Sequence, residues 1–521
     1  MSMSREIHTV GDWSWHLREG VRLTDNELSP TEWATRPVAI VKQNLQRTVY
    51  RFNTSAGAVY AKLLRVNTPR SRIRDWFRGP KAKLESDRLL HLRALHIAVP
   101  EVLGWGRGPA ASAIITREVP NAVPLEAILS LAPTPKERRR LTHELGFFFG
   151  HLHSAGIIHP DPHPGNILLA DGRLILLDTH AVQFDRKNKE LANLVLLNRW
   201  FQNRSTVTDR ARFWLAYRSI HTATLAFADP AFRRLVESGT HDSNLRFWQQ
   251  RRKRYVGSNR QFQPLKVGHW RGFRVSDAST ELLARLSPDP LAPFAPGTPY
   301  PRLKDGPSST VVLLPNGVLL KRFRIKKRST LLKNLFRPSS AMRSWINGHS
   351  LLDRGVATAR PLLLLEQRQR GVTGEAVLAF EFLAGAAELK PALVQAVEVQ
   401  RSEMIGKLAR LLRRMHHVGV SHRDLKASNI LVNSAQEPVL IDLVGVTLDT
   451  RVSVAIRQRD LSRLAGSFVD RGDIRSSQRL CFLRSYLGPS HWEGWKVWWK
   501  QIVLLLDRKR KKNVVSGRPL T

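Results

Sequence analysis

"SHRDLKASNILV", Ser421 to Val432, repeats an arrangement that the chain already shows as "IHPDPHPGNILL", Ile158 to Leu169. In both stretches an aspartate follows a histidine after one residue, an asparagine comes five positions later, and an apolar run follows. The two aspartates, Asp161 and Asp424, are 263 positions apart. Because internal repetition at a fixed spacing indicates repeated structural units, the two stretches suggest a duplicated domain.

The repetition extends well beyond these two stretches. Lys62 in "VYAKLL" corresponds to Lys321 in "VLLKRF" at an offset of 259, and Asp178 corresponds to Asp442 at an offset of 264. Further along, "NLVLLNRWFQNR" and "DLSRLAGSFVDR" match at an offset of 267. An offset that drifts slowly over more than 150 residues is expected of two homologous domains with small insertions.

Length and composition agree with two large domains. The chain has 521 residues, more than one hydrophobic core usually supports. In "SPDPLAPFAPGTPYP" (287–301) prolines recur every two or three residues and remove backbone donors, so we interpret this segment as a linker. The sequence therefore predicts a first domain over 1–286, with an N-terminal extension of about 1–40, and a second domain over 302–521.

Each copy runs from strand patterns to helix patterns. Short β-branched or aromatic runs such as "TVYRF", "AVYAKLL", "TVVLL" and "GVLLKRF" flank turn residues, as in hairpins. "AKLESDRLLHLRAL" and "RSEMIGKLARLLRRMHHV" have apolar residues at helical spacing. This order predicts an α+β fold of two tandem bilobal protein-kinase-like domains, each with a small antiparallel β-sheet N-lobe and a mainly helical C-lobe.

Charge restricts the partners of the protein. Lys and Arg number 83 against 43 Asp and Glu, a formal net charge of +40. This balance predicts attraction to an anionic membrane surface, a phosphorylated glycolipid or nucleic acid, although a solvated basic surface alone would also produce it. We do not expect nucleic acid, since no nucleic-acid-binding motif accompanies the charge.

Cysteine content and hydropathy predict a cytoplasmic protein. Cys481 is the only cysteine, so no intrachain disulfide can form. The N-terminus lacks an apolar segment of signal-peptide length, and the chain has no uncharged apolar run of about 18 residues. Any membrane contact is therefore expected to be peripheral.

The spacing of the repeated motif predicts phosphoryl transfer. That reaction needs a carboxylate to orient the acceptor, oxygen ligands for Mg²⁺ and cations for the ATP phosphates. We assign Asp161 and Asp424 as catalytic bases. Amide and carboxylate oxygens suit Mg²⁺, and the candidate metal ligands are Asn166, Asp178, Asn429 and Asp442.

Candidate phosphate-binding cations precede these motifs. Lys62 and Lys321 lie in apolar strand patterns, 99 and 103 residues before the respective base, although an edge-strand lysine would show the same pattern. Glu85, on the helix that follows, is positioned to hold Lys62 in an ion pair. Its counterpart in the second copy is Ser344, so the second domain is expected to lack this pair.

The two candidate phosphate loops differ. "KDGPSST" offers Gly306 and the hydroxyls of Ser308 and Ser309, although an ordinary turn would have the same residues, whereas "KQNLQRT" has no glycine. His163 and Lys426, each two residues after its aspartate, are further candidates for contact with the transferred phosphate.

Three histidines receive structural interpretations. His159 and His422 are interpreted as braces of the catalytic loops, because no other ligand stands at metal-binding spacing. His180 follows Asp178 in "DTH", and a structural role is also favoured for it.

The segment after the second metal-binding aspartate favours a small acceptor. Protein kinases place a long activation segment ending near APE at this point. Here only about fifteen residues separate Asp442 from the next helical pattern, "RQRDLSRL", and no APE is present. A small-molecule or sugar hydroxyl therefore fits better than a peptide.

Several motifs resemble the lipopolysaccharide kinase family, which includes Kdo kinases and core heptose kinases. In the second domain these are "HRDLKASNIL", "LIDL", "RQRDLSRL" and "AMRSWINGHSLLDRGVATARPL". In the first they are "HPDPHPGNILL", "LLDTHAVQF" and "FRGPKAKLESDRLLHLRALHIAVPEVLGWG". "HPDPHPGN" is also similar to the quinone-biosynthesis kinase-like proteins, but their KxGQ motif is missing.

The resemblance implies ATP-dependent phosphorylation of a sugar hydroxyl on a lipopolysaccharide core or similar glycolipid, at the cytoplasmic face of a bacterial inner membrane. It implies the same bases, phosphate-binding lysines and Mg²⁺ ligands as the spacing does. Because Ser344 replaces an acidic residue and the first domain lacks a glycine loop, one domain is a candidate pseudokinase. The alternatives are an atypical serine, threonine or tyrosine protein kinase, or a non-catalytic scaffold.

Basic and aromatic segments suggest how an anionic glycolipid or membrane would be met. "RVNTPRSRIRDWFRGPKAK" and "KRFRIKKRSTLLKNLFR" occupy corresponding places and mix cations with apolar residues. The tail "WEGWKVWWKQIVLLLDRKRKKN" combines four tryptophans with a basic run, and it is interpreted either as an interfacial helix or as a core helix with a solvated end.

Overall fold

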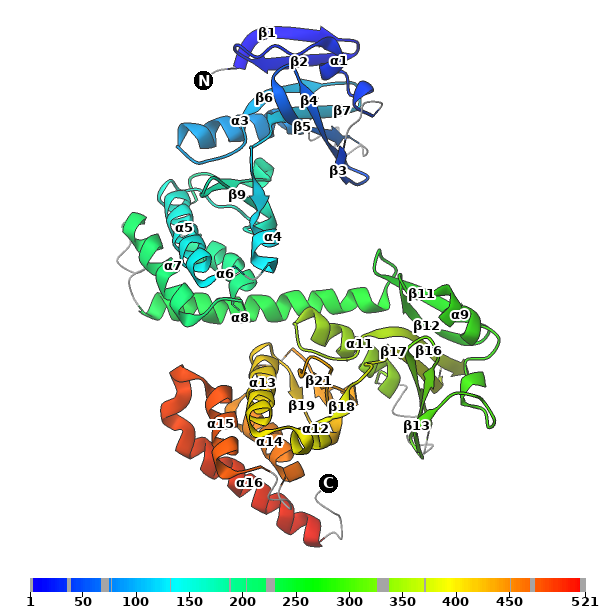
Figure 1. Cartoon of the computed structure of the whole chain (residues 1–521). Helices are drawn as coiled ribbons and strands as arrows, with labels where there is room; N and C mark the ends of the chain where they lie inside the picture. Colours follow the sequence, from blue (N-terminus) through cyan, green and yellow to red (C-terminus); the bar gives the residue numbers. More distant parts are fainter. Residues whose placement is uncertain are drawn as a thin grey trace. The chain divides into compact units, whose positions relative to one another are not determined.

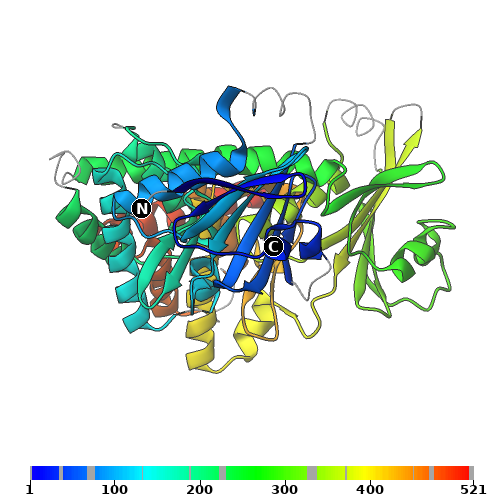
Figure 2. The same cartoon turned by 90° about the horizontal axis from the view of Figure 1, so that it is seen from above.

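The computed structural model divides into two compact units, Met1–Ser243 and Asn244–Thr521. Each unit has a seven-stranded antiparallel sheet. A mainly helical part follows the sheet in each unit (Figures 1 and 2). The structure describes the following residues: 3–34, 39–66, 75, 77–131, 133–186, 189–202, 204–221, 230–325, 337–369, 372–449, 451–468 and 474–515.

The first sheet has the order β1-β2-β6-β7-β5-β4-β3. Its strands are β1 (Met3–Val10), β2 (Trp13–Arg18), β3 (Ala39–Gln43), β4 (Arg47–Thr54), β5 (Gly57–Arg65), β6 (Val102–Arg107) and β7 (Ala111–Arg117). Aromatic residues such as Trp15 and Trp33 fill the core on one face. Helix α3 (Lys81–Ala94) covers the other face through Leu89. Burial alternates along β4, so each face of the sheet has its own apolar layer.

The helical part of the first unit contains α4 (Leu125–Ser130), α5 (Pro135–Ser154), α6 (Glu190–Phe201) and α7 (Val207–Ile220). A small sheet of β8 (Val123–Pro124), β9 (Ile167–Ala170) and β10 (Arg173–Leu176) accompanies these helices. Helix α5 starts with a capping box of Thr134 and Glu137. Gly146 allows α7 to pack closely on α5, because a Cβ there would lie 2.4 Å from the Phe213 carbonyl oxygen.

The second sheet repeats this plan, with the order β11-β12-β16-β17-β15-β14-β13. Its strands are β11 (Phe262–Val267), β12 (Trp270–Val275), β13 (Arg302–Gly306), β14 (Ser309–Leu314), β15 (Val318–Phe323), β16 (Pro361–Gln369) and β17 (Val372–Glu381). Helix α11 (Ser340–Asp353) takes the place of α3. Val311 pairs with Lys321 as Val49 pairs with Lys62, so the register of the lysine strand is the same in both units.

The second helical part contains α12 (Leu389–Gln395), α13 (Glu398–His417), α14 (Val454–Ala465), α15 (Ser476–Leu487) and α16 (Trp495–Val515). Short strands β18 (Ala387–Glu388), β20 (Ile430–Val432) and β21 (Pro438–Leu440) form one small sheet, and β19 (Ser421–His422) pairs with β22 (Val446–Thr447). The α+β class and the two bilobal kinase-like domains predicted from the sequence are confirmed.

The boundary between the units differs from the linker that we expected. It falls within α8 (Pro230–Arg252), after Ser243. The β11–β12 hairpin belongs to the second sheet, and Phe294, inside the proline-rich segment 287–301, is buried in the core of that sheet. Proline removes backbone donors, but it does not prevent neighbouring side chains from packing. This segment therefore packs against the second sheet as part of the second unit.

The expected N-terminal extension is likewise part of the first sheet. Strands β1 and β2 form a hairpin whose turn contains Gly11, with a φ of +54°. The β11–β12 hairpin has Gly268 at the same point, with a φ of +55°. Glycine adopts this left-handed conformation without steric cost. The duplication therefore starts at the first strand of the chain.

The tryptophan-rich tail is a helix packed on the core. Trp495, Trp498 and Trp499 of α16 are partly buried against the core of the second helical part. This confirms the core-helix interpretation of its apolar face, although Val503 and Leu504 remain about two-fifths exposed. No described helix is long and apolar enough to cross a bilayer. Most of the two basic segments, at 67–74 and 326–336, lies outside the described residues.

Candidate active site

The lysine of the first unit is held by an acidic residue from α3. Lys62 projects from β5, and its Nζ lies 2.6 Å from Oε1 of Glu85. Both side chains are largely buried, with exposed fractions of 18% and 8%. An ion pair that is shielded from water holds its geometry better than a solvated one, so Glu85 fixes the position of the ammonium. The structure brings together the two residues that the sequence pairs.

Asp178 lies beside this lysine, directly after β10. Its backbone is left-handed, with φ at +52°, a conformation in which aspartate and asparagine are enriched. Lys62 Nζ is 3.8 Å from Asp178 Oδ1, and Nδ1 of His180 is 2.9 Å from the same oxygen. The hydrogen bond with His180 and the charge of Lys62 keep the pKa of Asp178 well below its usual range, against the opposing effect of burial. His180 therefore touches the candidate metal ligand directly.

The catalytic loop brings Asp161 and Asn166 together. Nδ2 of Asn166 donates to the backbone oxygen of Asp161 at 3.0 Å and approaches its Oδ2 at 3.4 Å. The Leu177 amide donates to the Asn166 carbonyl at 2.8 Å, which joins the loop to the residue before Asp178. Asp161, Asn166 and Asp178 thus form one constellation, and the carboxylate of Asp161 is exposed to solvent.

His163 has neighbours other than the phosphate that the sequence suggested. Its Nδ1 accepts a hydrogen bond from the Gly165 amide at 2.7 Å, and its Nε2 lies 3.8 Å from Glu126. The ring meets Trp200 edge to face with centroids 3.8 Å apart. In this structure His163 supports the loop, and contact with phosphate remains a prediction.

A series of hydrogen bonds between buried polar side chains, which the sequence did not predict, supports the catalytic loop. His159 Nδ1 accepts from the Asp161 amide at 3.2 Å, and the His159 carbonyl accepts from Asn193 Nδ2 at 2.5 Å. Oδ1 of Asn193 lies 3.0 Å from Nε2 of His153, whose Nδ1 lies 2.8 Å from the Tyr217 hydroxyl. Burial lowers the pKa of His153 to about 4, so the ring is neutral at pH 7.

The second unit has the corresponding series of hydrogen bonds, with an aspartate in it. Nε2 of His416 lies 3.3 Å from Asp460, its Nδ1 lies 2.7 Å from the Tyr486 hydroxyl, and the His422 amide donates to Asp460 at 2.9 Å. Asp460 aligns with Asn193 at the offset of 267. That alignment was the signal in the sequence: matched buried polar residues in two copies point to a common structural function.

The lysine of the second unit has a different partner. Lys321 Nζ lies 3.1 Å from Asp442 Oδ1, and it is 5.1 Å from the ring centroid of Phe323. Ser344 stands on α11 where Glu85 stands on α3, and its hydroxyl donates to the Ser340 carbonyl. Burial would raise the pKa of Asp442, but the charge and hydrogen bond of Lys321 outweigh it and lower the pKa.

The second catalytic loop has the geometry of the first. Nδ2 of Asn429 donates to the Asp424 carbonyl at 2.8 Å and lies 3.3 Å from its Oδ2. Lys426 Nζ is 3.6 Å from Asp424 Oδ2, so the cation suggested for phosphate contact stands beside the candidate base. The Ile441 amide donates to the Asn429 carbonyl, which places the loop next to Asp442.

The candidate phosphate loop of the second unit is a tight hairpin between β13 and β14. Gly306 pairs with Ser309, and Ser308 occupies the turn. Ser309 is buried, whereas Ser308 is exposed. The Ser308 carbonyl accepts from the Arg324 amide at 3.0 Å. The structure thus places these residues on the lysine sheet, while a role in phosphate binding remains a prediction.

The donor set fits a magnesium ion. In each loop the asparagine uses its Nδ2 on the aspartate, so Oδ1 is the remaining polar atom of the amide. Together with the ionised carboxylate of Asp178 or Asp442 it supplies hard oxygen ligands, and phosphate oxygens and water usually complete a magnesium shell. Among the described residues no group of three His, Cys, Asp or Glu side chains is arranged to hold a metal ion.

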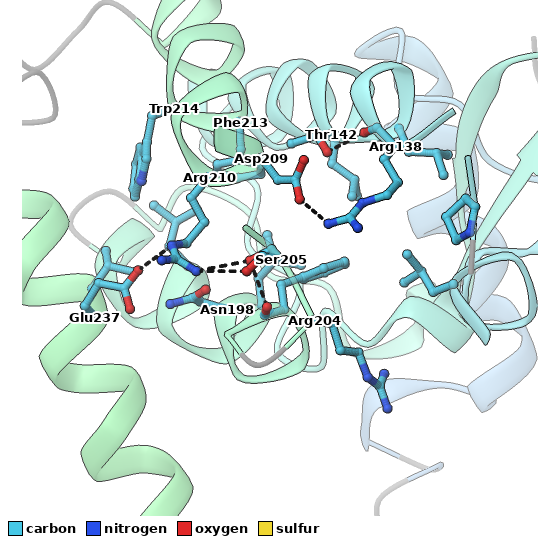
Figure 3. Close-up of a pocket in the computed structure, with 18 residues that line it drawn as sticks. Arg138, Thr142, Asn198, Arg204, Ser205, Asp209, Arg210, Phe213, Trp214 and Glu237 are labelled. Carbon is cyan, nitrogen blue, oxygen red and sulfur yellow. Dashed lines mark hydrogen bonds and ion pairs between the residues drawn. The ribbon is translucent and has the colours of Figure 1, made fainter. Parts of the chain in front are cut away.

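A separate cavity of about 380 Å³ lies in the helical part of the first unit (Figure 3). It is bordered by α5, α6, α7 and the first half of α8, and its walls are mainly apolar. Arg210 reaches Glu237 at its rim, with Nε 3.2 Å from the carboxylate. A smaller cavity of about 140 Å³ lies at the corresponding place in the second unit. No candidate active-site residue lines either cavity.

Each unit has a seven-stranded sheet with a lysine on it, a loop with a paired aspartate and asparagine, and a further aspartate after the next hairpin. Together these features define a protein-kinase-like domain, and the chain contains two such domains. The model of the lipopolysaccharide kinase (Kdo/WaaP) family matches residues 33–217 and again residues 315–486. The chain therefore belongs to this family.

Individual relatives match less than half of this chain. A 3-deoxy-D-manno-octulosonic acid kinase of Vibrio vulnificus (strain YJ016) is 31% identical over 136 residues, which is 26% of this chain and 56% of that protein. Among solved structures, WaaP in complex with acyl carrier protein is 21% identical, with a TM-score of 0.30 over 42% of this chain and 99% of that one. A crystal structure of WbdD is 14% identical, with a TM-score of 0.27 over 39% of this chain and 51% of that one.

Proposed function

We propose that the protein transfers the γ-phosphate of ATP to a sugar hydroxyl of a lipopolysaccharide core or a similar anionic glycolipid. Family membership supports the reaction class. One observation, made in each unit, carries the proposal. A lysine lies beside an aspartate, and that aspartate follows a loop in which an asparagine is hydrogen-bonded to a second aspartate. In the first unit the roles fall to Lys62 for the phosphates and Asp161 for the acceptor.

The transfer uses these residues in a definite order. The carboxylate of Asp161 accepts the proton of the acceptor hydroxyl as its oxygen bonds to the γ-phosphorus, and the bond to the leaving oxygen of ADP breaks. Lys62, held by Glu85, faces the phosphate chain. Asn166 and Asp178 would hold Mg²⁺, which neutralises charge on the phosphates when bound. The Asn166 amide also orients Asp161 by its contact with Oδ2.

We propose that the first unit is the catalytic one and that the second has a regulatory or weak nucleotide-binding role. The ion pair of Lys62 and Glu85 leaves Asp178 at 3.8 Å from the ammonium. In the second unit Lys321 takes Asp442 as its direct partner, because Ser344 offers no charge. If Asp442 held a metal, Lys321 would lose this partner, whereas Lys62 would keep Glu85 when Asp178 held one, so the second site would position the phosphates less firmly.

A sugar acceptor suits the surroundings of both bases. Residues 179–189 lie between Asp178 and α6, and 443–453 lie between Asp442 and α14. Segments this short do not provide the platform on which protein kinases hold a peptide. The net charge of +40 favours an anionic acceptor and peripheral contact with an anionic membrane at its cytoplasmic face.

The proposal is tested by phosphate transfer from labelled ATP to purified lipopolysaccharide or its core sugars, and to the chain itself. Label in the sugar, lost when Asp161 and Asp424 are both replaced by alanine, is the expected result. Label only on serine, threonine or tyrosine of the chain would favour a protein kinase. ATP binding without turnover would leave only a scaffold.

A further inference from the structure

Arg47 of the first unit points its guanidinium at the candidate nucleotide site. It is the first residue of β4, directly after the loop that connects β3 and β4. Its Nη1 lies 3.5 Å from Asp178 Oδ1, the oxygen that Lys62 Nζ approaches at 3.8 Å. The side chain of Arg47 is only 23% exposed. Two cations from neighbouring strands thus converge on one carboxylate oxygen, while Glu85 also pairs with Lys62.

In the loop before Arg47, backbone amides that a glycine-rich loop would offer to phosphate already form hydrogen bonds within the protein. Oδ1 of Asn44 accepts from the amides of Gln46 at 2.9 Å and Arg47 at 2.8 Å. The amide of Asn44 in turn donates to the Arg47 carbonyl at 2.9 Å. A phosphate-binding loop needs amides that are free to point at the anion. These three amides are already satisfied, so they are not available to a phosphate, and a side chain is the natural source of a contact.

The second unit has no charge at the equivalent position. Arg47 pairs with Leu64 in the strand of Lys62, and Ser309 pairs with Phe323 in the strand of Lys321. Both partners follow their lysine by two residues. The equivalent of Arg47 is therefore Ser309, in the hairpin that contains Gly306. The unit without a glycine in its loop is the one with an arginine at this position.

We propose that Arg47 binds the phosphate chain of the nucleotide in the first unit and replaces the backbone contacts of a glycine-rich loop. The inference rests on the proposed function of the site. Guanidinium forms forked hydrogen bonds to phosphate oxygens, which a single ammonium cannot do. If Asp178 held a Mg²⁺ ion, Arg47 and Lys62 would be free to contact the phosphates together.

An alternative is that Arg47 only neutralises Asp178 while the site is empty. The two roles predict opposite effects of removing the guanidinium. A phosphate ligand strengthens binding of ATP over adenosine, so its loss weakens ATP alone. A competitor of the metal opposes binding, so its loss would tighten binding of ATP with Mg²⁺.

The test measures equilibrium binding of ATP with Mg²⁺, and of adenosine, to the full chain by calorimetry. All variants carry Lys321→Ala, which weakens the second site so that the first is observed. Arg47→Ala is expected to weaken ATP binding about tenfold or more, which is the loss of one charge-assisted contact. It should leave adenosine binding unchanged, and Arg47→Lys should restore part of the affinity.

Arg51→Ala is the matched control, because it removes the same charge from the same strand. Arg51 makes two hydrogen bonds of 2.8 Å, both to Glu118, which is not a residue of the candidate nucleotide site. We expect it to bind ATP as the parent does. Unchanged or tighter ATP binding by Arg47→Ala, in a parent that binds ATP, would overturn the inference and leave the kinase proposal standing. A parent and wild type that bind no ATP would overturn both.

Discussion

The ammonium of Lys321 lies 3.1 Å from the carboxylate of Asp442, a pairing that replaces the Lys62–Glu85 pair of the first unit. The two lysines occupy the same register of equivalent sheets, so the difference comes from the helix that faces them. One helix presents Glu85 and the other Ser344. The duplicated fold has thus kept its catalytic loops while the ion-pair network around the lysine has diverged.

Removing each candidate base assigns the working unit. Asp161→Ala is expected to lower the rate of phosphate transfer by about 10²- to 10⁴-fold, the usual contribution of a positioned base. Asp424→Ala is expected to retain most of the activity. The measurement is kcat with labelled ATP and lipopolysaccharide at saturating substrate. The reverse pattern would make the second unit the catalytic one.

Neutralising Glu85 tests the ion pair of the first unit. Glu85→Gln keeps the shape of the side chain but leaves Lys62 without its buried carboxylate partner, so the ammonium is drawn toward Asp178. We expect kcat/KM for ATP to fall by about tenfold or more, which corresponds to about 1.4 kcal/mol. Glu118→Gln is the control, because Glu118 pairs with Arg51, and it should have little effect on kcat/KM for ATP. Equal losses in both variants would argue against a specific role for Glu85.

The buried His153 predicts an acid-sensitive first unit. Burial lowers its pKa from an ordinary 6.5 to about 4 in the folded state. Between these values the unfolded chain binds more protons, so the free energy of unfolding falls as the pH drops from about 6.5 toward 4 and is unaffected above that range. The full effect is of order 3 kcal/mol. Thermal unfolding measured from about pH 6.5 to pH 4 tests this pH dependence. The free energy of unfolding of His153→Gln should depend less steeply on pH than that of the wild type, even if the substitution changes the stability itself.

Buried His349 of the second unit complicates a scan of the whole chain. Its pKa is lowered to about 3, also by burial, so its contribution changes in the same direction over a similar range. The double variant His153→Gln with His349→Gln should flatten the pH dependence further. A slope that neither substitution changes would place the acid sensitivity in other groups.

The positive charge predicts binding to anionic membranes. Vesicles that contain anionic lipid should sediment with the protein at low ionic strength, and vesicles of zwitterionic lipid alone should not. Because salt screens charges beyond a Debye length of about 10 Å at 0.1 M, binding should weaken as salt is added. Salt-insensitive binding to both kinds of vesicle would instead indicate insertion of apolar residues, for which the exposed Val514 and Val515 of α16 are candidates.

The repeated motifs were sufficient to predict the fold class, and the catalytic and metal-binding roles of the residues that they single out stay predictions. A loop that carries Asp161 and Asn166 before a hairpin leaves few ways to present Asp178, because the hairpin returns the chain to the asparagine. The linker was misplaced because proline content reports on backbone donors and carries no information about side-chain burial such as that of Phe294.

The sequence by itself determined that the chain is a duplication with a lysine, two aspartates and an asparagine in each copy, since order and spacing along the chain encode these directly. Only the tertiary structure decided which groups meet across long separations in the sequence. Arg47 reaches Asp178, 131 residues away, and Asn193 supports His159 from a separate helix. Such contacts depend on how strands and helices pack, and burial then determines which charges keep their partners and how strongly each pair interacts.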